Sequence, residues 1–436
     1  MSETILQMVR EEPVGEGARL IHNSLTLPVM AYARSSGLFS MLRDGLHLPM
    51  KTVRYTSTEK VVEFMASLVA GCQHTVSINH RLVPDTTLAW ECLGKPRFAD
   101  QSGINRLLRS FTRENLQELE GVYHQYYLRH GLARRHPRNE ILIVDLDGVG
   151  LKAEGENYEG TSEGYFPGER GAKGYQCSFA YVHGYREGLG FVLGPGNARE
   201  AHHMVDILDL VEKRLEGRPP GRILLRGDGA HGTSPYVKEA LKRGYLILFK
   251  GKLPQSARKY AQYVGEWKPL KDENWGGEST LNRITGCPYP LRVVVFRKAG
   301  KDGAWGYWHL ITSLPRDGYP VERLMDLYFA REGAEAYVKT DKAGLHLRNL
   351  RTRCLNGIRA VLTLTLLTHN LILHALKAMF KPPLRVGVKA FTEKYAPLPA
   401  WLIRRGGILR LIFKEPNPLI SRYIKTAKRP SLLDYI

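Results

Sequence analysis

The sequence has few cysteines, and their positions exclude the two common ways in which cysteine stabilises a fold. Only five occur among 436 residues. An odd number, spread along the chain at wide intervals, forms neither a disulfide framework nor a zinc-binding spacing. A protein without disulfides is typical of a reducing compartment, so we expect a cytoplasmic location. The five residues are Cys72, Cys92, Cys177, Cys287 and Cys354.

A long uninterrupted hydrophobic run is also missing. The first residues, MSETILQMVREEPVGEG, contain no apolar stretch of the length that a signal peptide requires. The most apolar segment, residues 355–376, includes Arg359, Asn370 and His374 among its leucines and threonines. Such polar side chains are costly in a bilayer but are tolerated in a protein interior. The segment therefore predicts a buried helix, and no membrane association is expected.

Acidic residues are too few to balance the basic ones. Lysine and arginine number 63 against 43 acidic residues, which gives a formal net charge of +20 at pH 7. This much positive charge raises the local concentration of polyanions, so nucleic acid is the first candidate partner. Charge alone leaves open a ribosome-associated or merely basic protein. The aromatic K/R-G-F/Y motif of a common RNA-binding module is absent, which weighs against RNA.

The middle of the chain has the order of strands and helices that is typical of an α/β protein. Dense β-branched and apolar runs predict strands in NEILIVDLDGVGLK, YQCSFAYVHGY, GLGFVLGPG, RILLRGDG and YLILFKGK. An amphipathic helix is expected over residues 198–215, and the order of elements predicts a mixed sheet. Residues 60–135 have helical spacing with many arginines. A DNA-binding unit and a helical bundle with a solvated basic face both fit that region.

Acidic residues lie on two of the strands that otherwise look buried. Asp145 and Asp147 are two residues apart in VDLDG, so both side chains point to one face of their strand. Asp228 follows another apolar strand, at the carboxyl end where sites of open α/β sheets lie. Two converging carboxylates can bind a divalent metal ion. For Asp228, a role as a turn or helix-cap residue is an open alternative.

A third group of residues lies in LYFAREGAEAYVKTDK. Tyr328, Arg331, Glu335 and Lys342 have offsets of 0, 3, 7 and 14. On a continuous helix they fall within a stripe about 60° wide. Glu335 can complete a metal site, Arg331 and Lys342 can bind phosphates, and Tyr328 can stack on a nucleotide. The alternative is a solvated charged helix with pairs such as Glu335–Lys339.

The spacing Y-x2-R-x3-E-x6-K resembles that of the DDE transposases encoded by bacterial insertion sequences. DLDG resembles the strand that carries the first Asp of that family, and RGDGAHGT resembles its second-Asp segment. The three motifs occur in the family's order, with a β-rich insertion before the Glu. AGCQHTVSINHRLVPDTTLAWECLG resembles the N-terminal helical region of one branch. The resemblance covers most of residues 60–380 and implies a ribonuclease-H-like catalytic core.

The resemblance also implies a role for individual residues. Asp147, Asp228 and Glu335 are the implied catalytic metal ligands, with Asp145 as the alternative first ligand. The implied ions are two Mg²⁺, which Mn²⁺ can replace. The residues expected to contact DNA are Tyr328, Arg331, Lys342, Arg348, Arg351 and, in the insertion, Trp308. Trp305 and Tyr307 are further candidates for stacking on a flipped base, although packing within a β-hairpin explains all three aromatic residues equally well.

From these features we expect four regions and one activity. The regions are an N-terminal helical DNA-binding region (1–137), the catalytic core (138–252 and 321–380), a β-rich insertion (253–320) and a basic C-terminal region (381–436). The implied activity is DNA transposition by two-metal phosphoryl transfer, in a cut-and-paste reaction with a hairpin intermediate. Terminal inverted repeats and target DNA are the expected partners of a homodimer in the bacterial nucleoid. A DNA nuclease of the same fold and a domesticated, non-transposing DNA-binding protein are the alternatives.

Overall fold

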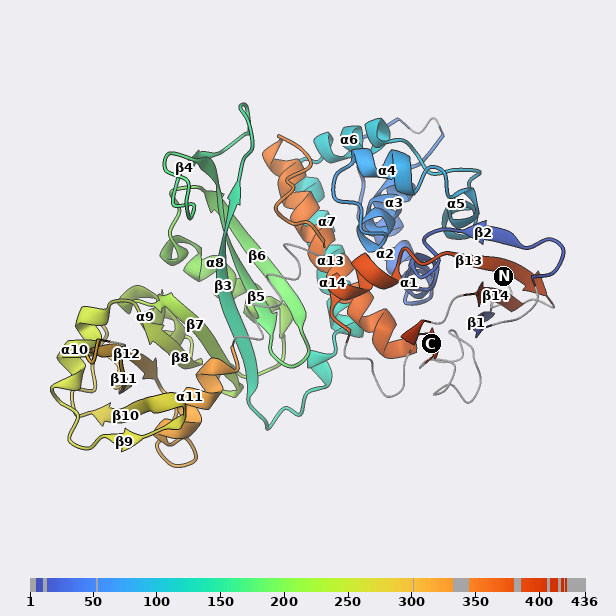
Figure 1. Cartoon of the computed structure of the whole chain (residues 1–436). Helices are drawn as coiled ribbons and strands as arrows, with labels where there is room; N and C mark the ends of the chain where they lie inside the picture. Colours follow the sequence, from blue (N-terminus) through green and yellow to red (C-terminus); the bar gives the residue numbers. More distant parts are fainter. Residues whose placement is uncertain are drawn as a thin grey trace. The chain divides into compact units, whose positions relative to one another are not determined.

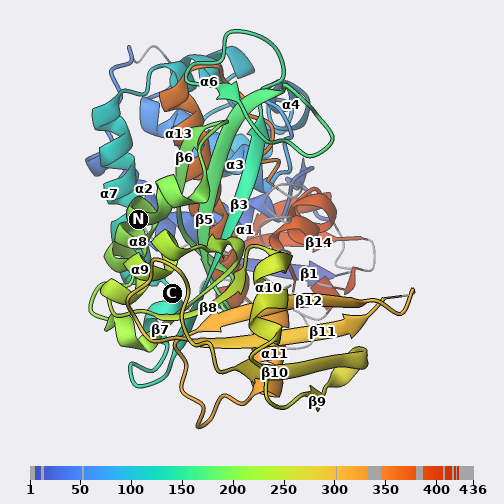
Figure 2. The same ribbon diagram turned by 90° about the vertical axis from the view of Figure 1, so that its left-hand side faces the viewer.

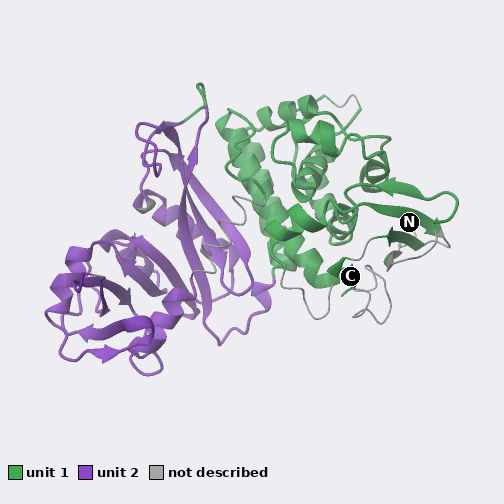
Figure 3. Ribbon diagram, viewed as in Figure 1, with its two compact units in different colours: residues 1–131, 155–160, 339–436 green, residues 132–154, 161–338 purple. Residues whose placement is uncertain are grey.

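The computed structural model describes two compact units, each built from segments that are far apart in the sequence (Figure 3). Unit 1 comprises residues 1–131, 155–160 and 339–436, and unit 2 comprises 132–154 and 161–338. Within these ranges the structure describes residues 5–10, 14–51, 54–300, 302–331, 345–379, 386–405, 408–414, 417–418 and 420–421.

Unit 2 is organised around one ten-stranded sheet. In spatial order the strands are β4-β5-β3-β7-β8-β12-β11-β10-β9, and β6 pairs with β5. Their bounds are β3 Leu142–Lys152, β4 Ser162–Glu163, β5 Lys173–Val182, β6 Glu187–Pro195, β7 Ile223–Gly232, β8 Leu246–Gly251, β9 Lys268–Pro269, β10 Asn274–Ser279, β11 Arg292–Ala299 and β12 Trp305–Thr312. All five strands expected in the middle of the chain are present.

The sheet is mixed, as the order of its elements predicts. β3 lies between β5 and β7, antiparallel to the first and parallel to the second (Figure 1). β8 continues the parallel part beside β7, and β12 then pairs antiparallel with β8. The β11–β12 hairpin therefore belongs to the same sheet as the core strands, because residues 310–312 of β12 pair with β8.

The helices of unit 2 cover the sheet. α8 packs against β5, β6 and β7, and α9 packs against β7 and β8. In Figure 2, α10 lies across β11 and β12. The helix bounds are α8 Glu200–Arg214, α9 Ser234–Lys242, α10 Pro254–Ala261 and α11 Val321–Phe329. A core of buried residues from β7, β8, β11, β12 and α11 lies on one face: Leu224, Leu248, Val294, Phe296, Leu310, Leu314, Leu324 and Met325.

Unit 1 is mostly helical. The bounds of its helices are α1 Thr26–Ser35, α2 Leu38–Gly45, α3 Ser57–Val69, α4 Val76–Arg81, α5 Thr86–Leu93, α6 Gln101–Arg109, α7 Arg113–His130, α13 Leu355–Met379 and α14 Val388–Ala390. Side chains that accept hydrogen bonds from free backbone N–H groups fix several helix starts. Asp100 caps α6 in this way, and Thr112 caps α7.

A small sheet in unit 1 pairs the two ends of the chain, which the sequence did not predict. Its order is β1-β14-β13-β2. The strands are β1 Ile5–Arg10, β2 Arg19–Ile21, β13 Ala400–Arg405 and β14 Ile408–Phe413. β1 is parallel to β14, and β2 is antiparallel to β13. Neither terminal segment is periodic enough alone to indicate a strand, because each strand depends on a partner about 400 residues away.

The most apolar segment of the chain is α13, which forms the core of unit 1. By length and composition it could cross a membrane, but 89% of its most apolar window is buried inside the protein. It packs against α1, α3, α6 and α7. Its polar side chains have internal partners: the Asn370 amide donates to the Tyr123 hydroxyl at 3.0 Å, and the His374 ring lies 3.0 Å from the Tyr126 hydroxyl. The expected buried helix is confirmed.

The segment from Pro320 to Phe380 is not one helical run. α11 ends at Phe329, and α13 begins at Leu355. Residues 345–354 are irregular, and residues 332–344 are outside the described part of the chain. The expectation of one continuous helical stripe from Tyr328 to Lys342 therefore fails at its start, because Arg331 lies in a turn that follows α11.

One carboxyl of unit 1 is buried and makes no ion pair with the described residues. Glu63 on α3 is fully buried, and its Oε2 accepts a hydrogen bond from the Ala99 backbone N–H at 2.9 Å. Its Oε1 has no hydrogen-bond partner within the described residues. Burial raises the pKa of Glu63 to about 8, because the ionised form would lie in a region of low polarity.

We expect Glu63→Gln to remove a pH dependence of stability. The pKa of Glu63 is raised on folding, so its contribution is fully present below the usual carboxyl range. It is lost as the pH rises to about 8. Relative to Glu63→Gln, the wild type should lose on the order of 2–4 kcal/mol between pH 5 and pH 8.5. Urea unfolding followed by the helical circular dichroism signal measures this difference. Parallel pH profiles for the two proteins would contradict it.

Candidate active site

The central feature of unit 2 is a buried ion pair between its two neighbouring parallel strands. Asp145 of β3 and Arg226 of β7 are register partners, and theirs is the last pairing between these strands. The Arg226 guanidinium donates to both carboxylate oxygens of Asp145, with Nε to Oδ1 at 2.7 Å and Nη2 to Oδ2 at 2.8 Å. The side chains are 0% and 1% exposed. Such a bidentate pair satisfies both groups without water.

Arg226 also holds two further segments in place. Its Nη1 donates to the backbone carbonyl of Leu327, near the end of α11. Its Nη2 lies 2.9 Å from Nδ1 of His183, which follows β5. Since the guanidinium has only donors, Nδ1 of His183 is the acceptor. Asp145 is thus enclosed by its partners and has no oxygen directed to an incoming ligand.

Asp147 and Asp228 lie two residues beyond this pair on their respective strands. Because side chains alternate along a strand, both are on the same sheet face as Asp145 and Arg226. They are also more accessible: the side chain of Asp147 is 17% exposed and that of Asp228 is 45% exposed. Of the two acids of VDLDG, Asp145 is therefore buried and Asp147 is more accessible.

The backbone around Asp228 is irregular. The ladder between β7 and β8 is interrupted between Gly227 and Gly232, so residues 228–231 leave the regular pairing. The ring of His231 lies directly over Gly227, where a Cβ atom would be 2.5 Å from the ring. Glycine is required there because any side chain would collide with the ring. Such irregularities redirect side chains at the ends of strands.

His231 is the hydrogen-bond partner of Asp228. Its Nδ1 lies 2.8 Å from Oδ1 of Asp228, and the backbone N–H of Ala230 donates to the same oxygen at 3.0 Å. Burial alone would raise the pKa of Asp228. The hydrogen bond and charge of His231 and the positive charge of Arg331 outweigh it and hold the pKa of Asp228 far below its usual value. Asp228 is therefore a carboxylate at neutral pH.

Arg331 brings a positive charge to the two exposed acids. Its Nη2 donates to Oδ1 of Asp147 at 2.9 Å and to the backbone carbonyl of Leu146 at 3.0 Å. The residue is only 3% exposed. Burial opposes its charge, but Asp147 and Asp228 raise the pKa of Arg331 above its usual value. Among the four residues of the predicted stripe, Arg331 is therefore the one that the structure places beside the acids. It is buried and paired, unlike a residue on a solvated helix face.

The other residues of that stripe have different surroundings. Tyr328, in the last turn of α11, packs against Trp308 with ring centroids 6.1 Å apart. Trp308 itself stacks on Phe296 at 4.1 Å and packs against the hydrophobic core. The alternative of internal packing therefore describes Trp308. Glu335 and Lys342 lie outside the described residues.

Arg348 and Arg351, both expected to contact DNA, differ in their exposure to solvent. Arg348 is exposed. Arg351 instead donates to the backbone carbonyl of Cys72 at 2.8 Å, and its guanidinium lies 5.4 Å from the Phe64 ring centroid. Its burial lowers the pKa of Arg351. Arg351 thus makes its contacts inside unit 1.

An aromatic cluster lies on the sheet face opposite to Trp308. Trp275, Arg297 and Tyr307 are register partners across β10, β11 and β12. The Arg297 guanidinium is 4.2 Å from the ring centroid of Trp267 and 4.5 Å from that of Trp305. Tyr307 and Trp305 therefore do not form one stacking surface with Trp308, because odd and even residues of β12 face opposite ways.

The exposed acids have the chemistry of a divalent metal site that is still incomplete. Carboxylate oxygens are the ligands that Mg²⁺ and Mn²⁺ prefer. Asp147 and Asp228 supply them from two strands on one sheet face. Within the described residues there is no group of three His, Cys, Asp or Glu side chains that could hold a metal ion. A third ligand would have to come from outside those residues, where Glu335 lies.

The sequence of the whole central part of the chain matches one family. Residues 15–386 match the model described as transposase DDE domain, group 1. The chain belongs to the DDE transposases. This transposase is therefore an enzyme that cleaves and transfers DNA strands, as the order of the acidic motifs predicted.

The solved structures that match this chain include two transposases. A piggyBac transposase synaptic complex with hairpin DNA has 10% identity and a TM-score of 0.43, over 86% of this chain and 79% of that one. A Mos1 transposase paired-end complex has 11% identity and a TM-score of 0.18, over 46% of this chain and 60% of that one. No curated protein matches significantly.

Sequence reasoning missed two residues that organise the site of the transposase. His231 occurs three residues after Asp228, and this spacing is a local signal that could have identified it. Arg226 stands two residues before Asp228, but nothing local connects it with Asp145, which precedes it by 81 residues. Its role depends on the register of β3 against β7.

We expect Asp145 and Asp147 to differ in their effect on stability. Asp145→Asn leaves the fully buried Arg226 without its counter-charge, which costs about 3–5 kcal/mol. Asp147→Asn costs less, because Arg331 keeps the Leu146 carbonyl and the nearby charge of Asp228. Urea unfolding followed by tryptophan fluorescence tests this, since Trp267, Trp275, Trp305 and Trp308 all belong to unit 2. Equal losses for the two variants would contradict the assignment.

Proposed function

We propose that this transposase cuts DNA at the ends of its own element and joins them to target DNA by phosphoryl transfer. The observation that carries the proposal is the pair of accessible carboxylates, Asp147 and Asp228, which lie beyond the last pairing of β3 and β7 with Arg331 beside them. The first metal ligand in this proposal is Asp147, since Asp145 is enclosed by Arg226. Glu335 is the third ligand.

We propose that unit 2 contains a ribonuclease-H-like core. Three antiparallel strands (β6, β5 and β3) followed by the parallel strands β7 and β8 support this, with acids on the first and fourth strands in chain order. β9 to β12 then form the insertion between the second acid and the third. The proposed DNA-binding region is the helical part of unit 1.

In this proposal, each residue of the site has a separate role. Asp147 and Asp228 present oxygen ligands, and a divalent ion held there would polarise the phosphoryl oxygen and lower the pKa of the attacking hydroxyl. His231 keeps Asp228 ionised and oriented. Arg331 neutralises the acids before DNA arrives, and its guanidinium fork is suited to the phosphate whose charge develops during the transfer. Lys342 and Arg348 are the proposed contacts to the phosphates of the transposon end.

A hairpin intermediate and a cut-and-paste outcome are part of the proposal. Hairpin formation requires a sharply bent strand and a stabilised unstacked base. Tyr328 and Trp308 pack on each other at the end of α11, near Arg331 in the sequence. The partly exposed edges of these rings are the aromatic surface that the proposal assigns to that base.

Cleavage of the element's own ends tests the proposal. Plasmid DNA carrying those ends is incubated with Mg²⁺ or Mn²⁺ and either wild type, Asp147→Asn, Asp228→Asn or Glu335→Gln. Each substitution keeps the side-chain shape and removes a ligand charge, so each should lower excision about 100-fold or more while end binding persists. Denaturing gels detect a hairpin as a slow species at the transposon end.

The matched control is Asp317→Asn, which removes an exposed carboxylate from a loop of the same unit. It should excise like the wild type. A second readout is the rise in unfolding temperature on adding Mn²⁺, which Asp147→Asn and Asp228→Asn should lose. DNA cleavage that does not depend on the element's ends would favour a nuclease of the same fold. Binding without cutting by the wild type would favour a domesticated DNA-binding protein, and full activity of Glu335→Gln would refute its role as a ligand.

A further inference from the structure

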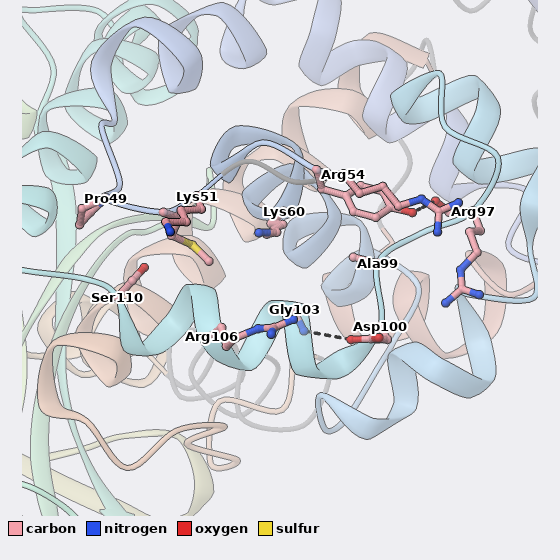
Figure 4. Close-up of a pocket in the computed structure, with 12 residues that line it drawn as sticks. Pro49, Lys51, Arg54, Lys60, Arg97, Ala99, Asp100, Gly103, Arg106 and Ser110 are labelled. Carbon is pink, nitrogen blue, oxygen red and sulfur yellow. Dashed lines mark hydrogen bonds between the residues drawn. The ribbon is translucent and has the colours of Figure 1, made fainter.

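Unit 1 contains a cavity of about 680 Å³ that is lined by five basic side chains. These side chains come from separate parts of the unit. Lys51 follows α2, Arg54 precedes α3, Lys60 lies on α3, Arg97 precedes α6 and Arg106 lies on α6. In Figure 4, Lys60 and Arg106 lie on opposite sides of the cavity, with Lys51 toward one end and Arg97 toward the other. The fold thus brings together cations that the sequence separates.

These cations have few acidic neighbours in the described part of the chain: the charges of Glu59 and Glu63 act on Lys60, and that of Asp100 acts on Arg106. None of the five makes an ion pair there, although the neighbouring Lys95 does, with Glu59 at 3.2 Å. Burial and then the nearby charge of Arg106 lower the pKa of Lys60, so the positive charges repel one another. Five basic side chains around one cavity, four of them exposed, raise the local concentration of anions there.

The acidic groups at the cavity are already engaged. Asp100 lines it, but its Oδ1 accepts hydrogen bonds from the Ser102 hydroxyl at 2.6 Å and the Gly103 N–H at 3.0 Å, as the cap of α6. Glu63 is buried behind Ala99, and its raised pKa keeps it largely protonated near neutral pH. The net charge that faces an incoming ligand is therefore strongly positive.

Apart from Asp100 and Ser110, the remaining lining is apolar, which limits the kind of anion. Pro49, Met50, Tyr55 and Ala99 share the walls with the cations. The hydroxyl of Tyr55 donates to the Arg97 carbonyl at 2.7 Å, and its ring is mostly buried, with Arg54 and Lys95 at 6.0 and 5.8 Å from the ring centroid. A single small anion would leave most of this volume unfilled. A sugar–phosphate chain supplies phosphates for the cations and deoxyribose for the apolar walls.

We propose that this cavity binds a segment of the DNA phosphate backbone, without reading its sequence. The proposal rests on the proposed function, since it takes DNA as the substrate, and it adds a second DNA contact that is separate from the carboxylates of unit 2. Sequence independence follows from the part of DNA that is bound, because contacts to phosphate and sugar carry no sequence information.

The test is DNA binding by a cavity variant and a charge-matched control. The cavity variant is Lys60→Gln with Arg106→Gln. The control is Arg109→Gln with Arg113→Gln, which removes two exposed charges from the neighbouring α6 and α7 that do not line the cavity. Fluorescence anisotropy is measured with two 30-base-pair duplexes of unrelated sequence, in EDTA, over a range of KCl concentrations.

The cavity variant should bind both duplexes about tenfold more weakly at low salt. Its plot of log K against log [KCl] should lose about 0.9 of slope for each phosphate contact removed, or about 1.8 in all. The control should show a much smaller loss of affinity at low salt and a much smaller change in the slope of log K against log [KCl]. Equal losses in the two variants, an unchanged cavity variant, or a loss confined to one of the two duplexes would overturn the proposal.

A measurement on the wild type avoids any effect of the substitutions on folding. Acetylation of lysines by a small reagent, read by mass spectrometry, should decrease at Lys51 and Lys60 when the duplex is added. Lys242, exposed on α9 of unit 2, is the reference site. Unprotected Lys51 and Lys60 at saturating duplex would overturn the proposal, as would stronger protection by polyglutamate than by DNA at equal charge.

The two proposals fail in different ways. If the wild type binds neither duplex nor its element's ends, the proposed function fails. If the wild type binds and cleaves and the cavity variant does the same with unchanged salt dependence, only the cavity assignment fails. At protein concentrations well above its dissociation constant, the cavity variant should still cleave, because none of its altered residues belongs to the catalytic site.

Discussion

The buried ion pair of Asp145 and Arg226 determines how the central sheet of this transposase is assembled. It joins β3 to β7 at their last pairing, and through the Leu327 carbonyl it also fixes the end of α11. An ion pair in a protein interior adds little net stability over a well-packed apolar pair, because removing the charges from water is costly. The ion pair instead fixes the register of β3 against β7. A shift of one residue between the strands would leave two unpaired charges in the core.

The position of the exposed acids follows from this pair. Once Asp145 and Arg226 are opposite each other, alternation along each strand directs Asp147 and Asp228 to the same face, two residues farther on. β3 and β7 are no longer paired there, and the irregularity between Gly227 and Gly232 accommodates the ring of His231. β3 thus carries one carboxylate buried in the ion pair, Asp145, and one more accessible carboxylate, Asp147, which we propose as a metal ligand.

Local patterns predicted the strands and the acids well, because the periodicity of an amphipathic or buried segment is visible in the sequence. They could not predict contacts that depend on register between distant strands, which include the pairing of Asp145 with Arg226. The predicted helical stripe of Tyr328, Arg331, Glu335 and Lys342 is interrupted at its start for another reason. Its geometry assumed one helix through Arg331, but α11 ends at Phe329, and the Arg331 side chain is held by the Leu146 carbonyl. Trp308 and Trp305 could have been separated from sequence alone, because residues three apart on a strand face opposite ways.

The sheet that joins the two ends of the chain has a consequence for the order of folding during synthesis. All residues of unit 2 have been synthesised once residue 338 has been added, whereas unit 1 still lacks its last segment. β1 emerges first, but its partner β14 is among the last strands to be made. In the finished sheet, β13 and β14 lie between β1 and β2. A product that terminates before residue 400 therefore has both N-terminal strands without a neighbour, as open edges that pair readily with other chains.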